Sequence, residues 1–246
     1  MNPTKGRILF NMLASIRALV FYTGYVISLV IYASFCILAG LFFPLKTRYV
    51  ICLQWNRFAI WWLTFTCNVR YHITGLENIP PHPFVILSNH QSPWETIFFV
   101  HFFQPVCPIL KFELLRIPFF GWGLKLLNPI AIDRNKRKEA RTALLTQGQA
   151  RIRDGFSVLV FPEGTRVDPG QDKKFSSGGA ELAIAAQTWA LPIAHNAGVY
   201  WPAHKMIKKP GTIAVHIGPA IDASNRDPRE LTEEVSLWIK AALQNM

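Results

Sequence analysis

The chain has 246 residues, of which 17% are charged and 50% are hydrophobic, and its net charge is +11. This hydrophobicity excludes an intrinsically disordered chain, and four cysteines are too few for a small domain built on disulfides. The basic excess is concentrated in residues 1–76, which contain seven Lys or Arg and no Asp or Glu. Such an excess attracts either anionic lipid or nucleic acid.

The N-terminal region contains two apolar stretches. Residues 18–45 carry no charge, and as a helix they would rise about 42 Å, more than the roughly 30 Å of hydrocarbon in a bilayer. The stretch is also longer than the apolar part of a signal peptide, about 7–15 residues, so we expect it to be retained as a membrane anchor. Residues 58–69 are too few to span and suit an interfacial or re-entrant helix.

Basic residues flank both apolar stretches, so a single span and a hairpin within one leaflet both remain open. Because the basic residues lie among apolar segments, we expect them to contact membrane lipids and not nucleic acid. We place these membrane-associated helices in residues 1–69 and a separate domain in residues 70–246.

From residue 70 onward, short apolar runs alternate with longer helical patterns. Strands are predicted at 69–73, 84–88, 106–110, 129–133, 157–161, 191–195 and 212–217, and helices near 93–103, 136–153, 178–189 and 228–243. This alternation predicts an α/β fold, in which loops at strand ends carry the chemistry. The polar, Gly- and Ser-rich residues 167–179 are typical of a mobile loop.

Residues 84–99 predict a strand, a turn and the start of a helix. The turn ends in Ser92-Pro93-Trp-Glu95, which matches a capping box with Ser92 at N-cap and Glu95 at N3. His90 then lies just before the helix, where its imidazole and the Glu95 carboxylate can meet. A carboxylate on one ring nitrogen fixes the tautomer and makes the other nitrogen a better base, so the pair predicts a general base for an alcohol. The alternative is that Glu95 only caps the helix.

Residues 157–166, SVLVFPEGTR, predict a strand followed by a tight turn in which Gly164 permits a positive φ. Arg166 would lie at the strand end, where its guanidinium can hold a phosphate through two hydrogen bonds. Lys111 and Arg134 follow other apolar runs at the same kind of strand end, so the three cations would form an anion site. The alternative is an ordinary turn with solvated charges.

Together these segments closely resemble the 1-acylglycerol-3-phosphate acyltransferases of phospholipid synthesis. Four motif blocks of that family map in order onto NHQSPWE (89–95), AIDR (131–134) with the upstream KFEL (111–114), FPEGTR (161–166) and LPIAHN (191–196). FPEGTR matches at all six positions, and the N-terminal membrane segment also fits the family plan. The resemblance covers roughly residues 70–220 and implies a mixed β-sheet flanked by helices.

Two positions depart from the family pattern. The family usually has Asp where this chain has Glu95, although the related lipid A acyltransferases have Glu there. The fourth block is more often Val-Pro-Ile-Val-Pro. Both differences bear on the acceptor, so another lysophospholipid or a lyso-ornithine lipid remains an alternative acceptor. A non-catalytic, basic protein that binds membranes is a further alternative.

The resemblance implies a mechanism that agrees with the residues. His90 takes the proton from the acceptor hydroxyl, Glu95 balances the charge of the imidazole, and the acceptor oxygen attacks the thioester of acyl-CoA or acyl carrier protein. Backbone N–H groups at the start of the helix at Pro93 are candidates for stabilising the oxyanion. The substrate-binding residues that the resemblance implies are Lys111, Arg134, Glu163, Gly164, Thr165 and Arg166.

The expected reaction acylates the sn-2 hydroxyl of lysophosphatidate and gives phosphatidate. We expect no cofactor beyond the acyl-CoA or acyl carrier protein substrate. We also expect no metal, because the histidines and cysteines show no HExxH or CxxC spacing. The expected location is the bacterial inner membrane, with the active site on the cytoplasmic face, where such donors are made.

Overall fold

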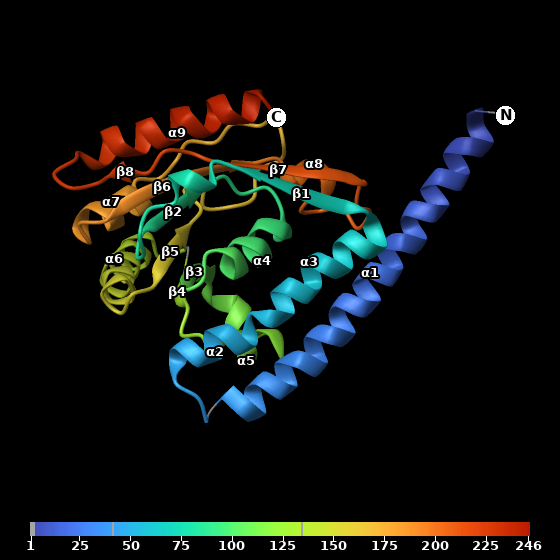
Figure 1. Cartoon of the computed structure of the whole chain (residues 1–246), viewed down its shortest axis with the longest axis horizontal. Coiled ribbons are helices and arrows are strands. Elements are labelled where there is room, and N and C mark those ends of the chain that lie inside the picture. Colours follow the sequence, from blue (N-terminus) through green and yellow to red (C-terminus); the bar gives the residue numbers. More distant parts are fainter. Residues whose placement is uncertain (1–2, 41, 134) are drawn as a thin grey trace.

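The N-terminal part of the chain, up to Cys67, is mainly helical. The computed structural model describes residues 3–40, 42–133 and 135–246. Helix α1 (Pro3–Gly40) is followed by α2 (Leu45–Cys52) and α3 (Gln54–Cys67). The chain reverses between α1 and α2, so that α3 runs back beside α1, and the two form a hairpin at one side of the molecule (Figure 1).

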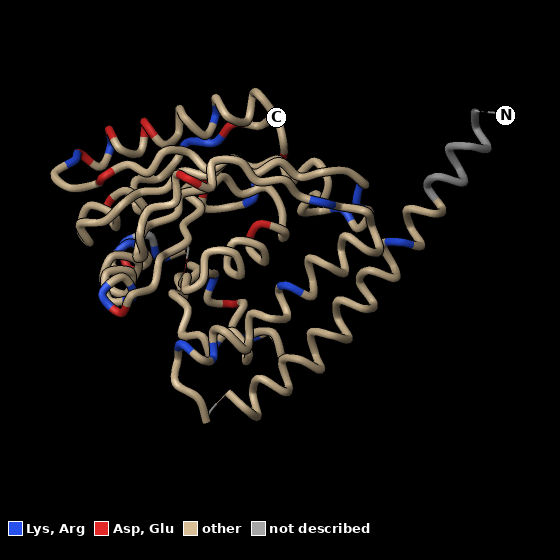
Figure 2. Tube along the Cα trace, viewed as in Figure 1, with Lys and Arg blue, Asp and Glu red and all other residues tan. Residues whose placement is uncertain are grey.

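The hairpin is held by a close approach between its two helices. The Trp62 indole N–H donates to the Phe21 carbonyl at 3.0 Å. A Cβ at Gly24 would lie 2.6 Å from the Trp62 ring, so only glycine allows this contact. The segment Met12–Gly40 is long and apolar enough to cross a membrane. Figure 2 shows few charged residues on residues 12–40 of α1 and on α3, in contrast to the C-terminal helix.

Within the described residues, the strands form one mixed sheet in the order β1-β7-β6-β2-β5-β3-β4, with β8 paired to β6. Strands β6, β2, β5, β3 and β4 are parallel, whereas β7 is antiparallel to β6 and parallel to β1. The carboxyl ends of the five parallel strands therefore share one edge of the sheet. The strands are β1 (Val69–Thr74), β2 (Val85–Ser88), β3 (Val106–Lys111), β4 (Ile130–Ile132), β5 (Ser157–Val160), β6 (Trp189–His195), β7 (Gly211–Ile217) and β8 (Ile221–Asp222).

Helices cover both faces of the sheet, as Figure 1 shows for α9 and α4. Helices α7 and α9 pack on β2 and β6, and α4 packs on β3 and on α3 of the hairpin. The remaining elements of the α/β part are α4 (Pro93–Phe102), α5 (Phe120–Lys125), α6 (Arg137–Arg153), α7 (Gly178–Ala185), α8 (Ala197–Tyr200), α9 (Pro228–Gln244), and the 3-10 turns η1 (Leu76–Asn78) and η2 (Phe112–Arg116).

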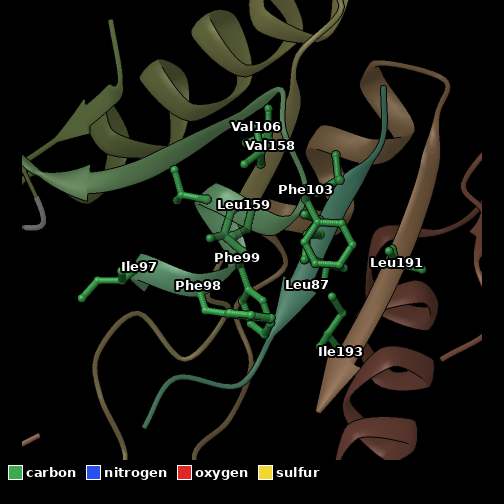
Figure 3. Close-up of a cluster of buried hydrophobic side chains, with 14 of the residues drawn as sticks. Leu87, Ile97, Phe98, Phe99, Phe103, Val106, Val158, Leu159, Leu191 and Ile193 are labelled. Carbon is green, nitrogen blue, oxygen red and sulfur yellow. The ribbon is translucent and has the colours of Figure 1, made fainter. Parts of the chain in front are cut away.

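The core between α4 and the sheet is aromatic on the helix side and aliphatic on the sheet side (Figure 3). Phe99 and Phe103 are buried against Leu87 of β2, Leu159 of β5 and Leu191 of β6. Burying a side chain of this size contributes about 1.5–3 kcal/mol. This packing fixes α4, and with it the turn that joins β2 to α4.

The predicted α/β fold with a mixed β-sheet is confirmed. The seven predicted strands are also confirmed, and their bounds shift by at most two residues. Three predicted helices, α4, α6 and α9, are confirmed to within one residue. The predicted helix 178–189 is wrong at its C-terminal end, because α7 stops at Ala185, Gln187 has a left-handed φ of 50°, and β6 begins at Trp189. The short elements α5, α8 and β8 were not predicted.

Candidate active site

The turn after β2 is fixed to the end of β6. The Asn89 side-chain amide donates to the His195 carbonyl at 2.9 Å and accepts from the His195 backbone N–H at 3.0 Å. The His195 imidazole in turn donates from Nε2 to the Asn89 carbonyl at 2.8 Å and accepts at Nδ1 from the Ala197 N–H. Burial lowers the pKa of His195 below its usual value. Four hydrogen bonds therefore position the residue that precedes His90.

The predicted capping box at the start of α4 is confirmed. Glu95 is fully buried, and its Oε1 accepts three hydrogen bonds, from the His90 Nδ1 at 2.7 Å, the Gln91 N–H at 2.8 Å and the Ser92 N–H at 2.6 Å. The predicted meeting of His90 and Glu95 is thus confirmed. One carboxylate oxygen both caps the helix and holds the imidazole.

The Glu95 carboxyl is placed to carry a charge. Burial raises its pKa, but His195, the hydrogen bond with His90 and the backbone N–H bonds outweigh burial and hold the pKa below its usual range. Its second oxygen, Oε2, is buried without a hydrogen-bond partner in the described part of the chain. The ionised carboxylate therefore directs its interactions to the imidazole and the two backbone groups.

His90 is also fixed from the side of the FPEGTR segment. Its ring stacks on Phe161 with centroids 4.2 Å apart and planes 14° apart. Its backbone N–H donates to Glu163 Oε2 at 2.7 Å, and its carbonyl accepts from the Val167 N–H at 2.7 Å. The imidazole is only 9% exposed and lines a cavity. Because Glu95 holds Nδ1, Nε2 is the nitrogen left for a substrate.

Glu163 and Gly164 lie in the turn after β5, and Glu163 contacts the backbone of His90. Burial raises the pKa of Glu163 to about 7, the His90 N–H opposes this, and the charge of Glu95 adds to it. Gly164 has a φ of 70°, as predicted, which an L side chain adopts only with strain. Neither residue lines the cavity, and Glu163 holds the backbone of His90. That the two residues bind the substrate stays a prediction.

The backbone donors at the start of α4 are already occupied. Glu95 takes the N–H groups of Gln91 and Ser92, and the Ser92 hydroxyl accepts from the Trp94 N–H. Pro93 has no N–H. The expectation that the helix start stabilises an oxyanion is therefore wrong for this arrangement, because the capping box and the carboxylate use the groups that such a site would need.

A cavity of about 500 Å³ opens beside His90 and is large enough for a substantial ligand. Lys111, Thr165 and Arg166 line it, so three of the expected substrate-binding residues share the cavity with His90. The Lys111 ammonium pairs with the Glu113 carboxylate at 3.0 Å. Arg134 lies outside the described residues.

The rest of the cavity is mostly apolar, and much of its wall comes from the N-terminal helices. Tyr25 and Cys36 of α1, Cys52 of α2 and Trp55 of α3 line it, as does His204 from the segment between α8 and β7. The sequence carries no local signal for these residues, because they are brought to the cavity only by packing between distant segments. Phe161 lies in a motif that was singled out, but its stacking role was not foreseen.

The sequence of the chain is similar to those of known acyltransferases. Residues 70–196 match the acyltransferase family. The chain is 46% identical over 233 residues to a 1-acyl-sn-glycerol-3-phosphate acyltransferase of Pseudomonas aeruginosa, which covers 93% of this chain and 91% of that one. It is 28% identical to the 1-acyl-sn-glycerol-3-phosphate acyltransferase alpha of Mus musculus, over 86% of this chain and 73% of the mouse protein.

The fold is also that of a solved structure. The 1-acyl-sn-glycerophosphate (LPA) acyltransferase PlsC from Thermotoga maritima superposes with a TM-score of 0.79 over 96% of both chains, at 23% identity. At that identity the superposition supports the fold alone, and the family assignment rests on the sequence matches. The chain is an enzyme that belongs to the 1-acyl-sn-glycerol-3-phosphate acyltransferase family.

Proposed function

We propose that this acyltransferase transfers an acyl chain from a thioester to the sn-2 hydroxyl of lysophosphatidate and so makes phosphatidate. The observation that carries the proposal is the buried His90–Glu95 pair, 2.7 Å apart, at a cavity that Arg166 and Lys111 also line. A base for a hydroxyl and cations for a phosphate are the two groups that this acceptor requires. The 46% identical relative, named for the same reaction, supports the choice of acceptor.

In the proposed reaction, His90 Nε2 accepts the proton of the acceptor hydroxyl while Glu95 stabilises the imidazolium that forms. The acceptor oxygen attacks the thioester carbonyl and forms the new ester C–O bond. The C–S bond then breaks, and the proton held by His90 passes to the leaving thiolate. Arg166 and Lys111 hold the phosphate, and the apolar part of the cavity takes an acyl chain. The reaction needs no metal or other cofactor.

We assign membrane anchoring to residues 1–69 and catalysis to residues 70–246. Apolar side chains such as Leu19, Ile31 and Phe65 are exposed on the α1–α3 hairpin, which suits contact with lipid. The lack of acidic residues before Glu77 favours an anionic leaflet. We assign the enzyme to the bacterial inner membrane with its site on the cytoplasmic face, where acyl thioesters are available.

The test uses detergent-purified full-length protein, lysophosphatidate and labelled oleoyl-CoA. Wild type should form labelled phosphatidate, and His90→Ala should form none while unfolding at nearly the same temperature. The matched control is His72→Ala, which removes an exposed histidine of β1 and should leave the rate unchanged. Parallel reactions with acylated carrier protein identify the preferred donor.

Other outcomes distinguish the alternatives. Product from a lyso-ornithine lipid but not from lysophosphatidate would replace the acceptor and retain the reaction. Equal activity of His90→Ala and wild type would remove His90 from the mechanism. Absence of product with every donor and acceptor would contradict catalysis and favour a membrane-binding role.

A further inference from the structure

The segment that joins α8 to β7, residues 201–210, is clamped onto helix α1. Trp201 is buried and packs edge-to-face on Phe21, with centroids 5.1 Å apart. The Lys208 ammonium is also buried and lies 3.3 Å from the centre of the Tyr22 ring and 4.7 Å from that of Phe21. Cation–π contacts of this kind attract a buried ammonium. Trp201 and Lys208 are thus fixed against α1, and residues 204–207 between them are exposed.

Helix α8, which directly precedes this segment, contacts the turn between β2 and α4 that carries His90. The Gly198 N–H of α8 donates to the Gln91 side chain at 3.3 Å, and a Cβ at Gly198 would lie within 2.9 Å of both Gln91 and Pro169. Gln91 follows His90, and Pro169 lies three residues after Arg166. Helix α8 is therefore wedged between the two segments that carry His90 and Arg166.

His204 belongs to this segment, and its side chain forms part of the cavity wall. It lines the same cavity as His90, Thr165 and Arg166, although its side chain is otherwise exposed. Among the residues that the structure describes, the side chains of His204 and Arg166 have no ion-pair or hydrogen-bond partner. The Lys111 ammonium, in contrast, is paired with the Glu113 carboxylate. Within the described residues, two unpartnered donors thus line a cavity in which the Lys111 ammonium is already partly neutralised by Glu113.

A phosphomonoester carries close to two negative charges near neutral pH and offers three acceptor oxygens. Arg166 can engage two of those oxygens with its guanidinium, and Lys111, which is paired with Glu113, balances only part of the remaining charge, so the third oxygen can accept a further hydrogen bond. We propose that His204 donates an imidazole N–H to this remaining oxygen and so determines specificity for a phosphomonoester acceptor. This inference rests on the proposed function, because it names a further residue of the same acceptor site.

The test compares His204→Ala with wild type on two acceptors, lysophosphatidate and lysophosphatidylglycerol, whose phosphate is a diester. His204→Ala should raise the KM for lysophosphatidate about fivefold to tenfold, which corresponds to about 1–1.4 kcal/mol, with kcat nearly unchanged. The KM for the diester should change less than twofold. His204→Arg, which keeps a hydrogen-bond donor at this position, should show much less of the loss.

Lys205→Ala is the matched control, because Lys205 is the next residue, is exposed and does not line the cavity. It should leave the KM for lysophosphatidate within twofold of wild type. An unchanged KM in His204→Ala, or an equal rise in Lys205→Ala, would overturn the inference, the second by showing that the segment acts through general attraction to anionic lipid. Wild type that acylates no phosphomonoester would overturn the proposed function and this inference with it.

Discussion

Replacing Glu95 with Gln removes the buried charge beside His90 and preserves the shape of the side chain. The amide oxygen can still accept from the Gln91 and Ser92 N–H groups, which lie 2.8 and 2.6 Å from Oε1. The amide nitrogen takes the place of Oε2, which has no hydrogen-bond partner within the described residues. The substitution therefore tests the charge with little change to the helix cap.

The size of the effect follows from the 2.7 Å separation of His90 Nδ1 and Glu95 Oε1. At an effective dielectric constant of about 20, an imidazolium and a carboxylate at this distance attract by about 6 kcal/mol. A hydrogen bond to the neutral amide retains part of this attraction, so we expect a loss of about 3–5 kcal/mol in the transition state. Since about 1.4 kcal/mol changes a rate tenfold, kcat should fall by roughly 10²–10⁴.

The assay measures initial rates with lysophosphatidate and oleoyl-CoA at saturating and limiting acceptor. Because the charge acts on the proton transfer and not on the phosphate, the KM of Glu95→Gln should stay within about threefold of wild type. Glu95→Asp, which retains the charge, should retain more activity than Glu95→Gln. A Glu95→Gln variant that unfolds like wild type and retains more than a tenth of its kcat would refute the role of the charge.

Two further predictions concern stability, read from thermal unfolding in detergent. Burial raises the pKa of Glu163 from 4.5 to about 7, so the folded state holds a proton that the unfolded chain releases, and stability falls as the pH rises through this window. Glu163→Gln should remove that dependence and stabilise the protein by about 1–2 kcal/mol at pH 8, whereas a persistent slope would contradict the assignment. Asn89→Ala leaves two buried backbone groups of His195 unpaired and should cost about 2–4 kcal/mol, well above the cost of Asn56→Ala, which removes one hydrogen bond.

The strands and the turn between β2 and α4 were predictable because each depends on a local pattern of residues. Buried parallel strands have both faces covered and so appear as continuous apolar runs, as in β2 and β5. The capping box is encoded within four residues, and it alone placed Glu95 close to His90. The parallel topology then brings the carboxyl ends of β2 and β5 to one edge, which accounts for the contact between the His90 turn and the FPEGTR segment.

The features that were missed depend on packing between distant segments. The pairing of Asn89 with His195 joins residues 106 positions apart, and the sequence pattern of neither residue indicates a partner. The end of α7 at Ala185 depends on the left-handed conformation of Gln187, a residue type that does not signal such a turn. The oxyanion expectation was wrong because a sequence shows which N–H groups begin a helix but not which side chains already occupy them.

The N-terminal hairpin contributes to the candidate active site, in addition to the membrane anchoring that we propose for it. Helix α4, which carries Glu95, packs on α3, and the Asn56 side chain donates to the Ile97 carbonyl of α4 at 2.9 Å. Tyr25 and Trp55 of the hairpin line the cavity that begins at His90. In the proposed membrane-bound enzyme, the depth of the hairpin and the position of His90 are therefore set together. In the proposed reaction this coupling holds His90 at the level of a lipid hydroxyl, so the acceptor reaches the base without leaving the interface.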